Sequence, residues 1–207
     1  MKIVFIGDSI TDANHNYSDD SLGEGYVKII AERLKEKGCN AEILNKGHDG
    51  FTVFSLWKFL EHDCISKKPD IVSILIGCND VSIQMSTGRA LEEQEFQEYY
   101  EKILKKIRQK TKAKIICMGP FIFPHPQEFK NWIPIMKKAE KMAEMAAKKY
   151  NAVFVPLHDD LNETVEENNY EKITTDGTHL TIDGACIVAE KWLDEAVNWL
   201  DKSEEIG

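Results

Sequence analysis

The sequence predicts an α/β protein, a three-layer α/β/α sandwich around a five-stranded parallel sheet of the flavodoxin-like kind. Two observations carry this prediction: short apolar runs suit buried strands, and amphipathic helical patterns separate them. The third run is almost continuously apolar, which is typical of a parallel strand covered on both faces. At 207 residues, the whole chain (1–207) is expected to form one domain. The expected strands are Lys2–Ile6, Ala41–Leu44, Ile71–Ile76, Lys114–Met118 and Ala152–Val155.

Helices are expected between these strands, because apolar residues recur there at helical spacing. Strict alternation of strands and helices favours right-handed crossovers and a parallel sheet. Two connections, Thr11–Glu24 and Gly119–Pro134, are longer than a compact α/β unit needs, and such loops often carry function. The apolar positions that define the helices are Val27 to Leu34, Met136 to Ala146 and Ala185 to Trp199, with further helices expected over Thr52–Ile65 and Glu95–Arg108.

The composition of the chain argues against nucleic acids and membranes as binding partners. With a formal net charge of −9, the chain lacks the excess positive charge by which proteins bind the phosphates of nucleic acids. An anionic membrane surface would also repel it. No apolar stretch approaches the roughly 18 residues of a membrane span. Five widely spaced cysteines without a CxxC pair favour a reducing compartment, and Met1-Lys2 leads directly into a strand, so we expect a cytoplasmic protein without a secretory signal.

The strand order predicts where a ligand binds. Five parallel strands commonly take the order 2-1-3-4-5, with the binding crevice beyond the carboxyl ends of strands 1 and 3. Gly7-Asp8-Ser9 follows the first strand, and Gly77-Cys78-Asn79-Asp80 follows the third. Two polar turns that begin with glycine therefore converge on the expected crevice.

The residue types in these turns suit nucleophilic catalysis. A serine needs a base to take its proton, and the base needs an anion to hold its tautomer. Ser9 is the candidate nucleophile, His179 the candidate base and Asp176 its orienting carboxylate. Taken singly, a serine in the position of Ser9 more often caps the next helix, and Asp-x-x-His could be an ordinary turn.

Acyl transfer also needs donors aimed at the developing oxyanion. The backbone N–H of Ser9 and the side-chain amide of Asn79 are candidates. A third could come from the turn Asn45 to Gly50, where a glycine lets the backbone approach a ligand. Asp8 and Asp80 are expected to brace the two turns by accepting backbone N–H groups. We find no nucleotide, P-loop or zinc motif, so neither a cofactor nor a metal is expected.

Four blocks of the chain together resemble the SGNH, or GDSL, hydrolase family. They are Phe5 to Asp12, Asn45 to Gly50, Gly77-x-Asn79-Asp80, and Asp176-x-x-His179 followed by Leu180-Thr181 and Gly184. The resemblance implies that Ser9, His179 and Asp176 form the triad, and that Ser9, Gly50 and Asn79 form the oxyanion hole. It is nearest to small bacterial carbohydrate acetylesterases, although His48 and Phe51 depart from the commoner residues beside Gly50.

The resemblance implies a serine esterase for short acyl groups, with acetyl favoured by a short pocket expected between Gly50 and Asn79. An acetylated sugar would stack on loop aromatics, with Phe121 and Trp132 the best candidates, and His48 could also contact it. The alternatives are a lysophospholipase or thioesterase of the same family, and a flavodoxin-like module that binds phosphate or nucleotide without hydrolysis. Both a monomer and a homo-oligomer remain open.

Overall fold

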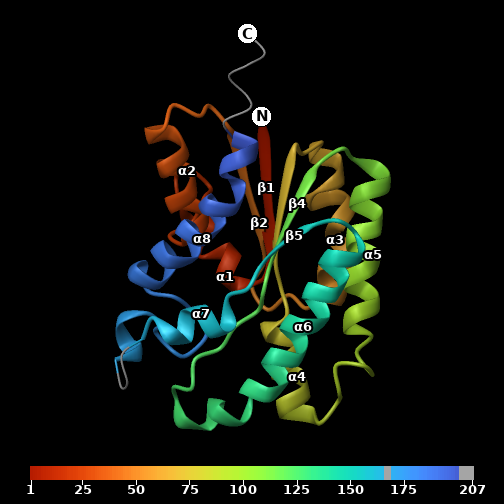
Figure 1. Ribbon diagram of the computed structural model, residues 1–207, viewed down its shortest axis with the longest axis vertical. Helices are drawn as coiled ribbons and strands as arrows, with labels where there is room; N and C mark the ends of the chain where they lie inside the picture. Colours follow the sequence, from red (N-terminus) through yellow and green to blue (C-terminus); the bar gives the residue numbers. More distant parts are fainter. Residues whose placement is uncertain (166–168, 201–207) are drawn as a thin grey trace.

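The computed structural model describes residues 1–165 and 169–200, and it is organised around one five-stranded sheet. The strand order is β2-β1-β3-β4-β5, and each neighbouring pair is parallel (Figure 1). Helices cover both faces of the sheet, so the predicted three-layer sandwich and its strand order are confirmed. The strands are β1 (Lys2–Gly7), β2 (Glu42–Gly47), β3 (Ile71–Leu75), β4 (Lys114–Met118) and β5 (Val153–Val155).

The central strands form the core because both of their faces are covered. All five residues of β3 are buried, as are residues 3–7 of β1. The second strand extends beyond its predicted end, because Asn45–Gly47 pair with Phe5–Gly7 of β1 instead of forming a turn. The polar turn after strand 2 therefore begins only at His48.

One face of the sheet is covered by α2 (Tyr26–Glu36) and α8 (Ile182–Leu200), which pack against each other. Trp192 of α8 is fully buried, and its indole N–H donates to the Ser73 hydroxyl of β3 at 3.1 Å. Its ring also lies 5.2 Å from that of Phe5, centroid to centroid. These contacts fix α8, and with it the loop that precedes it, against the sheet.

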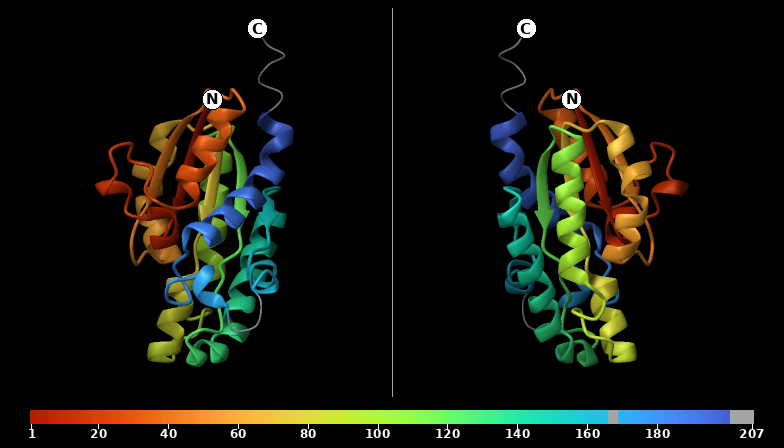
Figure 2. Two further views of the ribbon diagram at one scale, coloured as in Figure 1. Left: turned by 90° about the vertical axis from the view of Figure 1, so that its left-hand side faces the viewer. Right: turned by 90° about the vertical axis from the view of Figure 1, so that its right-hand side faces the viewer.

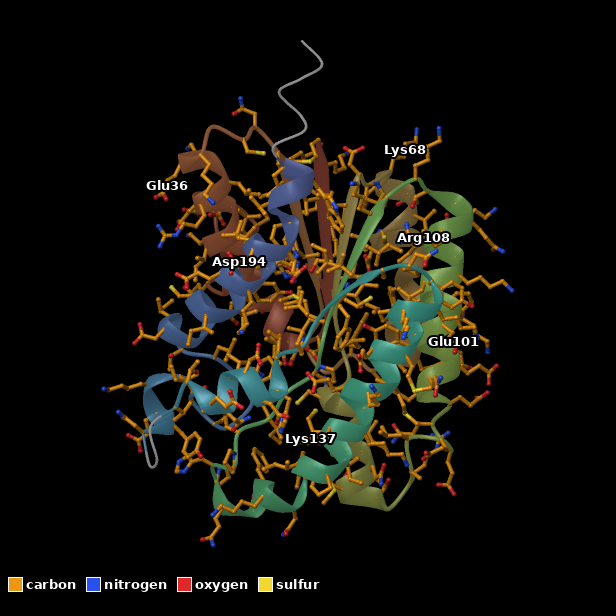
Figure 3. All side chains as sticks on the ribbon, in the orientation of Figure 1. Glu36, Lys68, Glu101, Arg108, Lys137 and Asp194 are labelled. Carbon is orange, nitrogen blue, oxygen red and sulfur yellow. The ribbon has the colours of Figure 1, made fainter. Side chains whose placement is uncertain are left out.

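The other face is covered by α3 (Val53–Asp63), α5 (Phe96–Lys110) and α6 (Ile133–Lys149). Arg108 near the end of α5 donates to the carbonyls of Ala113, Tyr150 and Asn151, which fastens α5 to the start of β4 and to the turn before β5 (Figure 3). Lys137 of α6 pairs with Asp159 at 2.7 Å. Each helix predicted from apolar spacing is confirmed, with shifts of a few residues at its ends.

Shorter elements gather at the carboxyl edge of the sheet (Figures 1 and 2). The segment between α1 and α2 stands out from the body of the molecule, as Figure 2 shows. The long connection Gly119–Pro134 is largely irregular until α6 begins. The elements at this edge are α1 (Ser9–Asp12), α4 (Cys78–Thr87) and α7 (His158–Glu163), with 3-10 turns η1 (His15–Tyr17), η3 (Gln127–Asn131) and η4 (Tyr170–Lys172). A further 3-10 turn, η2 (Ile65–Lys67), precedes β3 at the opposite, amino edge, where the N–H of Asp70 donates to the carbonyl of Lys2.

Candidate active site

Ser9 lies immediately beyond the carboxyl end of β1, as the first residue of α1. Asp8, not Ser9, caps this helix, because the Asp8 carboxylate accepts the N–H of Ile10 at 3.0 Å. The alternative interpretation of Ser9 as the helix cap is therefore wrong. The first amides of a helix have no acceptor within it, so the N–H of Ser9 can serve a ligand.

His179 reaches Ser9 from a tight loop that precedes α8. Its Nε2 lies 2.9 Å from the Ser9 Oγ, and its Nδ1 lies 2.6 Å from Asp176 Oδ2. The loop is closed by an antiparallel bridge between Thr174 and Leu180. The structure thus brings together three side chains from opposite ends of the chain, in the order that the sequence predicts.

Asp176 is held as a carboxylate by several donors. Its Oδ1 accepts the N–H of His179 and both the N–H and the hydroxyl of Thr178, each at 2.8 Å. Partial burial acts to raise the pKa of Asp176, but hydrogen bonds from His179 and Thr178 outweigh it and lower the pKa to about 2. An ionised Asp176 accepts the Nδ1 proton of His179, so that Nε2 faces Ser9 without a proton and can act as a base.

The candidate oxyanion donors come from the ends of two other strands. Asn79, near the start of α4, donates from Nδ2 to the carbonyl of Phe51 at 2.9 Å. A side-chain amide carries two protons, so one remains for a ligand. Gly50 adopts φ +71° in the turn after β2, a conformation that favours glycine. Gly77, at φ +135°, makes the sharp turn from β3 into α4.

Two buried carboxyl groups brace these turns, as the sequence predicts. The Asp8 carboxyl group accepts a hydrogen bond from the N–H of Ile10. The N–H of Val53 donates to both oxygens of Asp80, at 3.3 Å to Oδ1 and 3.1 Å to Oδ2. Burial raises the pKa of each group to about 7, with the backbone hydrogen bonds opposing the shift. Because Asp80 holds the first amide of α3, it ties α4 to the turn that contains Gly50.

Two cavities reach Ser9 and His179. The larger, of about 740 Å³, is lined by α1, the segment from Ala13 to Tyr26 and the start of α8. The smaller, of about 180 Å³, is lined by Cys78, Asn79 and Ser82 of α4 and by Phe129 and Trp132. The short pocket expected between Gly50 and Asn79 is found beside Asn79, but Gly50 does not line it, whereas Phe129 and Trp132 do.

The structure places the three predicted substrate-contacting residues in different surroundings. Trp132 lines the smaller cavity, beside Ser9. Phe121 was expected to offer a stacking face, and this is wrong: its side chain is fully buried in the core. His48 lines neither of these cavities; its Nε2 lies 2.9 Å from Asp63, and its ring stacks on Phe51 at 4.3 Å, so its contact with a sugar stays a prediction.

The sequence did not predict the roles of several residues that support the site. The hydroxyl and N–H of Thr178 stabilise Asp176, although the residue lies inside the motif itself. Asn45 is buried and donates from Nδ2 to the carbonyls of Thr11 and Leu22, which joins β2 to α1 and to the segment that follows it. Phe129 also lines the smaller cavity, and the sequence does not distinguish it from the other aromatic residues of the same connection. Hydrogen bonds between distant turns leave no periodic signal in a sequence.

Across residues 1–165 and 169–200, no three His, Cys, Asp or Glu side chains gather in a way that could hold a metal ion. In the same part of the chain, no helix is both long and apolar enough to cross a membrane. The geometry of the site described above can perform base-assisted attack by a serine hydroxyl.

The fold and the serine–histidine–aspartate arrangement define a hydrolase of the acyl-transfer class. Residues 5–185 match the model of the GDSL-like lipase/acylhydrolase family, and the chain belongs to this family. It is therefore a carboxylic ester hydrolase.

Two relatives illustrate the similarity. The chain is 31% identical over 204 residues to an acetylxylan esterase of Geobacillus stearothermophilus, with 94% of this chain and 93% of that protein covered. A solved structure of that esterase superimposes with a TM-score of 0.83 at 30% identity, covering 94% of this chain and 93% of the other. A protein from Parabacteroides merdae described as a GDSL-like lipase gives a TM-score of 0.85 at 28% identity, covering 93% and 94%.

Further structures of the Geobacillus esterase are described as catalytic mutants, in which a serine, an aspartate or a histidine is replaced by alanine. In that protein the aspartate and the histidine stand three positions apart, as Asp176 and His179 do. The same three residue types thus occur in both chains.

Proposed function

We propose that this protein is a serine esterase that removes acetyl groups from carbohydrates through an acyl-enzyme. The observation that carries the proposal is the continuous contact from Ser9 through His179 to Asp176, at 2.9 and 2.6 Å. These distances lie within the hydrogen-bond reach that general-base activation of a nucleophile requires.

The first half-reaction forms the acyl-enzyme. His179 Nε2 takes the Ser9 hydroxyl proton while Oγ bonds to the ester carbonyl carbon, and the carbonyl electrons move to oxygen. The N–H groups of Ser9 and Gly50 and the second amide proton of Asn79 bind this oxyanion. His179 then gives its proton to the alcohol oxygen as the carbon–oxygen bond of the ester breaks.

The second half-reaction releases the acid. His179 takes a proton from water, the water oxygen attacks the acyl carbon, and the oxyanion forms again at the same donors. Collapse breaks the bond to Ser9 Oγ, which regains its proton from His179. Asp176 stays ionised throughout and stabilises the imidazolium that forms in each half-reaction.

The size of the smaller cavity supports a short acyl group. At about 180 Å³ it lies below the roughly 300 Å³ at which pockets for whole small molecules begin. Trp132 and Phe129 line it together with residues of α4. An acetyl group fits such a space, whereas a long acyl chain would have to displace these aromatic side chains.

Initial rates on two series of esters test the proposal. We expect p-nitrophenyl esters to be hydrolysed more slowly as the acyl group grows from acetyl to octanoyl, and acetylated xylo-oligosaccharides to be deacetylated. Ser9→Ala is the control for background hydrolysis and should lose on the order of a thousand-fold or more in kcat. Circular dichroism of the variant should match the parent.

The alternatives predict other results. Rates that climb towards octanoyl would favour a lysophospholipase or thioesterase and contradict the acetylesterase proposal. Tight binding of a nucleotide or flavin without ester hydrolysis would favour a flavodoxin-like binding module, which would leave the Asp176–His179 pair without a role. Hydrolysis of simple acetates without action on any acetylated sugar would overturn the carbohydrate assignment alone.

A further inference from the structure

The larger cavity opens beside the same two catalytic groups as the acyl pocket. It reaches Ser9 and His179 but shares neither Asn79 nor Trp132 with the smaller cavity. Its volume of about 740 Å³ falls within the range of roughly 300–1,000 Å³ that ligand pockets occupy. An ester needs room on both sides of the attacked carbon, and of the two cavities described above this one has the volume for a large alcohol.

Resting on the proposed function, we infer that this cavity binds the alcohol half of the substrate as a neutral or cationic sugar. Tyr17 supplies the stacking surface, and acidic side chains on the rim disfavour anionic sugars. The assignment replaces the buried Phe121 as the aromatic platform for the sugar, and it leaves Trp132 on the acyl side.

Tyr17 is suited to this role by its exposure and its position. Its side chain is 91% exposed although it lines the cavity, and Ile182 at the start of α8, 63% exposed, lines the same cavity. An aromatic ring and an aliphatic side chain left open to solvent at a catalytic cleft offer apolar surface to the C–H faces of a sugar ring.

The segment that carries Tyr17 is fixed in place, although it stands out from the molecule (Figure 2). His15, just before it, is buried and its Nδ1 lies 2.9 Å from Asp12. The N–H of Glu24 donates to the carbonyl of Ala13 at 2.8 Å, which closes the segment at its base. Because this backbone is already held in place, only the exposed Tyr17 side chain has to be ordered when the ligand arrives, which lowers the entropic cost of binding.

The charges around the cavity have one sign. Asp12, Glu24 and Asp49 line it, and no lysine or arginine among the described residues does. Asp12 is engaged by His15 and by the N–H of Asp49. Glu24 and Asp49 are exposed and form no ion pair within residues 1–165 and 169–200. A carboxylate on the sugar would meet like charge here, while a neutral or cationic sugar would not.

The test compares four acetate esters by pH-stat titration. Ethyl acetate has a minimal alcohol, and monoacetylated methyl glycosides of glucose, glucuronic acid and glucosamine differ mainly in charge. Tyr17→Ala should lower kcat/KM for the glucoside acetate at least tenfold more than for ethyl acetate. Phe54→Ala, at an exposed aromatic residue of α3 that lines neither cavity, is the matched control and should change neither rate.

A second pair of variants tests the charge. Glu24→Gln should raise the ratio of kcat/KM for the glucuronide to that for the glucoside about fivefold. Glu36→Gln should leave this ratio unchanged, because Glu36 lies at the far end of α2 (Figure 3). Glucuronide and glucoside acetates hydrolysed equally well by the parent enzyme would overturn the charge preference, and an equal loss on ethyl acetate and the glucoside in Tyr17→Ala would overturn the stacking role.

These outcomes are separable from failure of the proposed function. If ethyl acetate is hydrolysed and no glycoside acetate is, the carbohydrate assignment and this inference fall together. If the glycosides are hydrolysed but neither Tyr17 nor Glu24 alters selectivity, only the inference fails.

Discussion

Replacing Asn79 by alanine removes one of the three proposed oxyanion donors and leaves the triad intact. The side-chain nitrogen of Asn79 donates one of its two protons to the carbonyl of Phe51 at 2.9 Å. This hydrogen bond fixes the direction of the other proton. Asn79 also lines the smaller cavity together with Ser9. The variant therefore loses a donor that the protein holds in position before substrate arrives.

The expected cost falls mainly on kcat. Loss of one preorganised oxyanion donor lowers kcat by about 10²–10³, equivalent to about 2.7–4 kcal/mol. KM should change little, because the ground-state carbonyl oxygen carries less charge than the oxyanion. Stability should also fall, by about 1–3 kcal/mol at most, because the Phe51 carbonyl loses its hydrogen-bond donor.

The assay is steady-state hydrolysis of p-nitrophenyl acetate, with urea unfolding measured in parallel. Asn162→Ala is a matched control: Asn162 donates from Nδ2 to the carbonyls of Ile122 and His158, and it lines neither cavity. It should lose stability without losing kcat. A fall of less than tenfold in kcat for Asn79→Ala would refute the role of this amide in the oxyanion hole.

Variants at three other positions probe the hydrogen bonds around the site. Asp176→Asn should lower kcat about 10⁴-fold, because the amide no longer fixes the His179 tautomer; a loss below tenfold in the same assay would contradict the triad. Burial raises the pKa of Asp80 to about 7, so folding stability falls as pH rises from about 4 to about 7. Asp80→Asn should raise Tm near pH 8 and change it little near pH 4, and equal shifts at both would contradict this linkage. His48→Ala should lower the unfolding free energy measured in urea by about 1–3 kcal/mol, because buried Asp63 loses a hydrogen-bond donor. His48→Gln keeps a nitrogen at the ε position and should recover this stability.

Much of the fold could be predicted because its signals are local. The continuous apolar run over β3 indicated a strand covered on both faces, and the structure buries all of its residues. The strand order expected from the sequence places Ser9 and Asn79 at one crevice without any knowledge of side-chain contacts. Element boundaries were less certain, because polar residues such as Asn45 can end a strand or, as here, continue it and bond to distant carbonyls.

The pocket walls could not be predicted for a different reason. Several aromatic residues occupy the connection before α6, and composition alone does not distinguish Phe121, which packs into the core, from Trp132, which faces the site. His48 posed the same problem: its partner Asp63 lies 15 residues away at the end of α3, with no periodic relation between them. Side chains on irregular segments are oriented by tertiary contacts that sequence spacing does not encode.

The most direct test of the account is chemical identification of the acyl-enzyme. The protein would be mixed with excess p-nitrophenyl acetate, quenched in acid within one turnover, and digested for peptide mass mapping. We predict that an acetyl group is found on Ser9, with a burst of one p-nitrophenolate per chain, and that Ser9→Ala shows neither. Hydrolysis at the normal rate by Ser9→Ala, or an acetyl group mapped to another residue, would contradict the central role given to this serine.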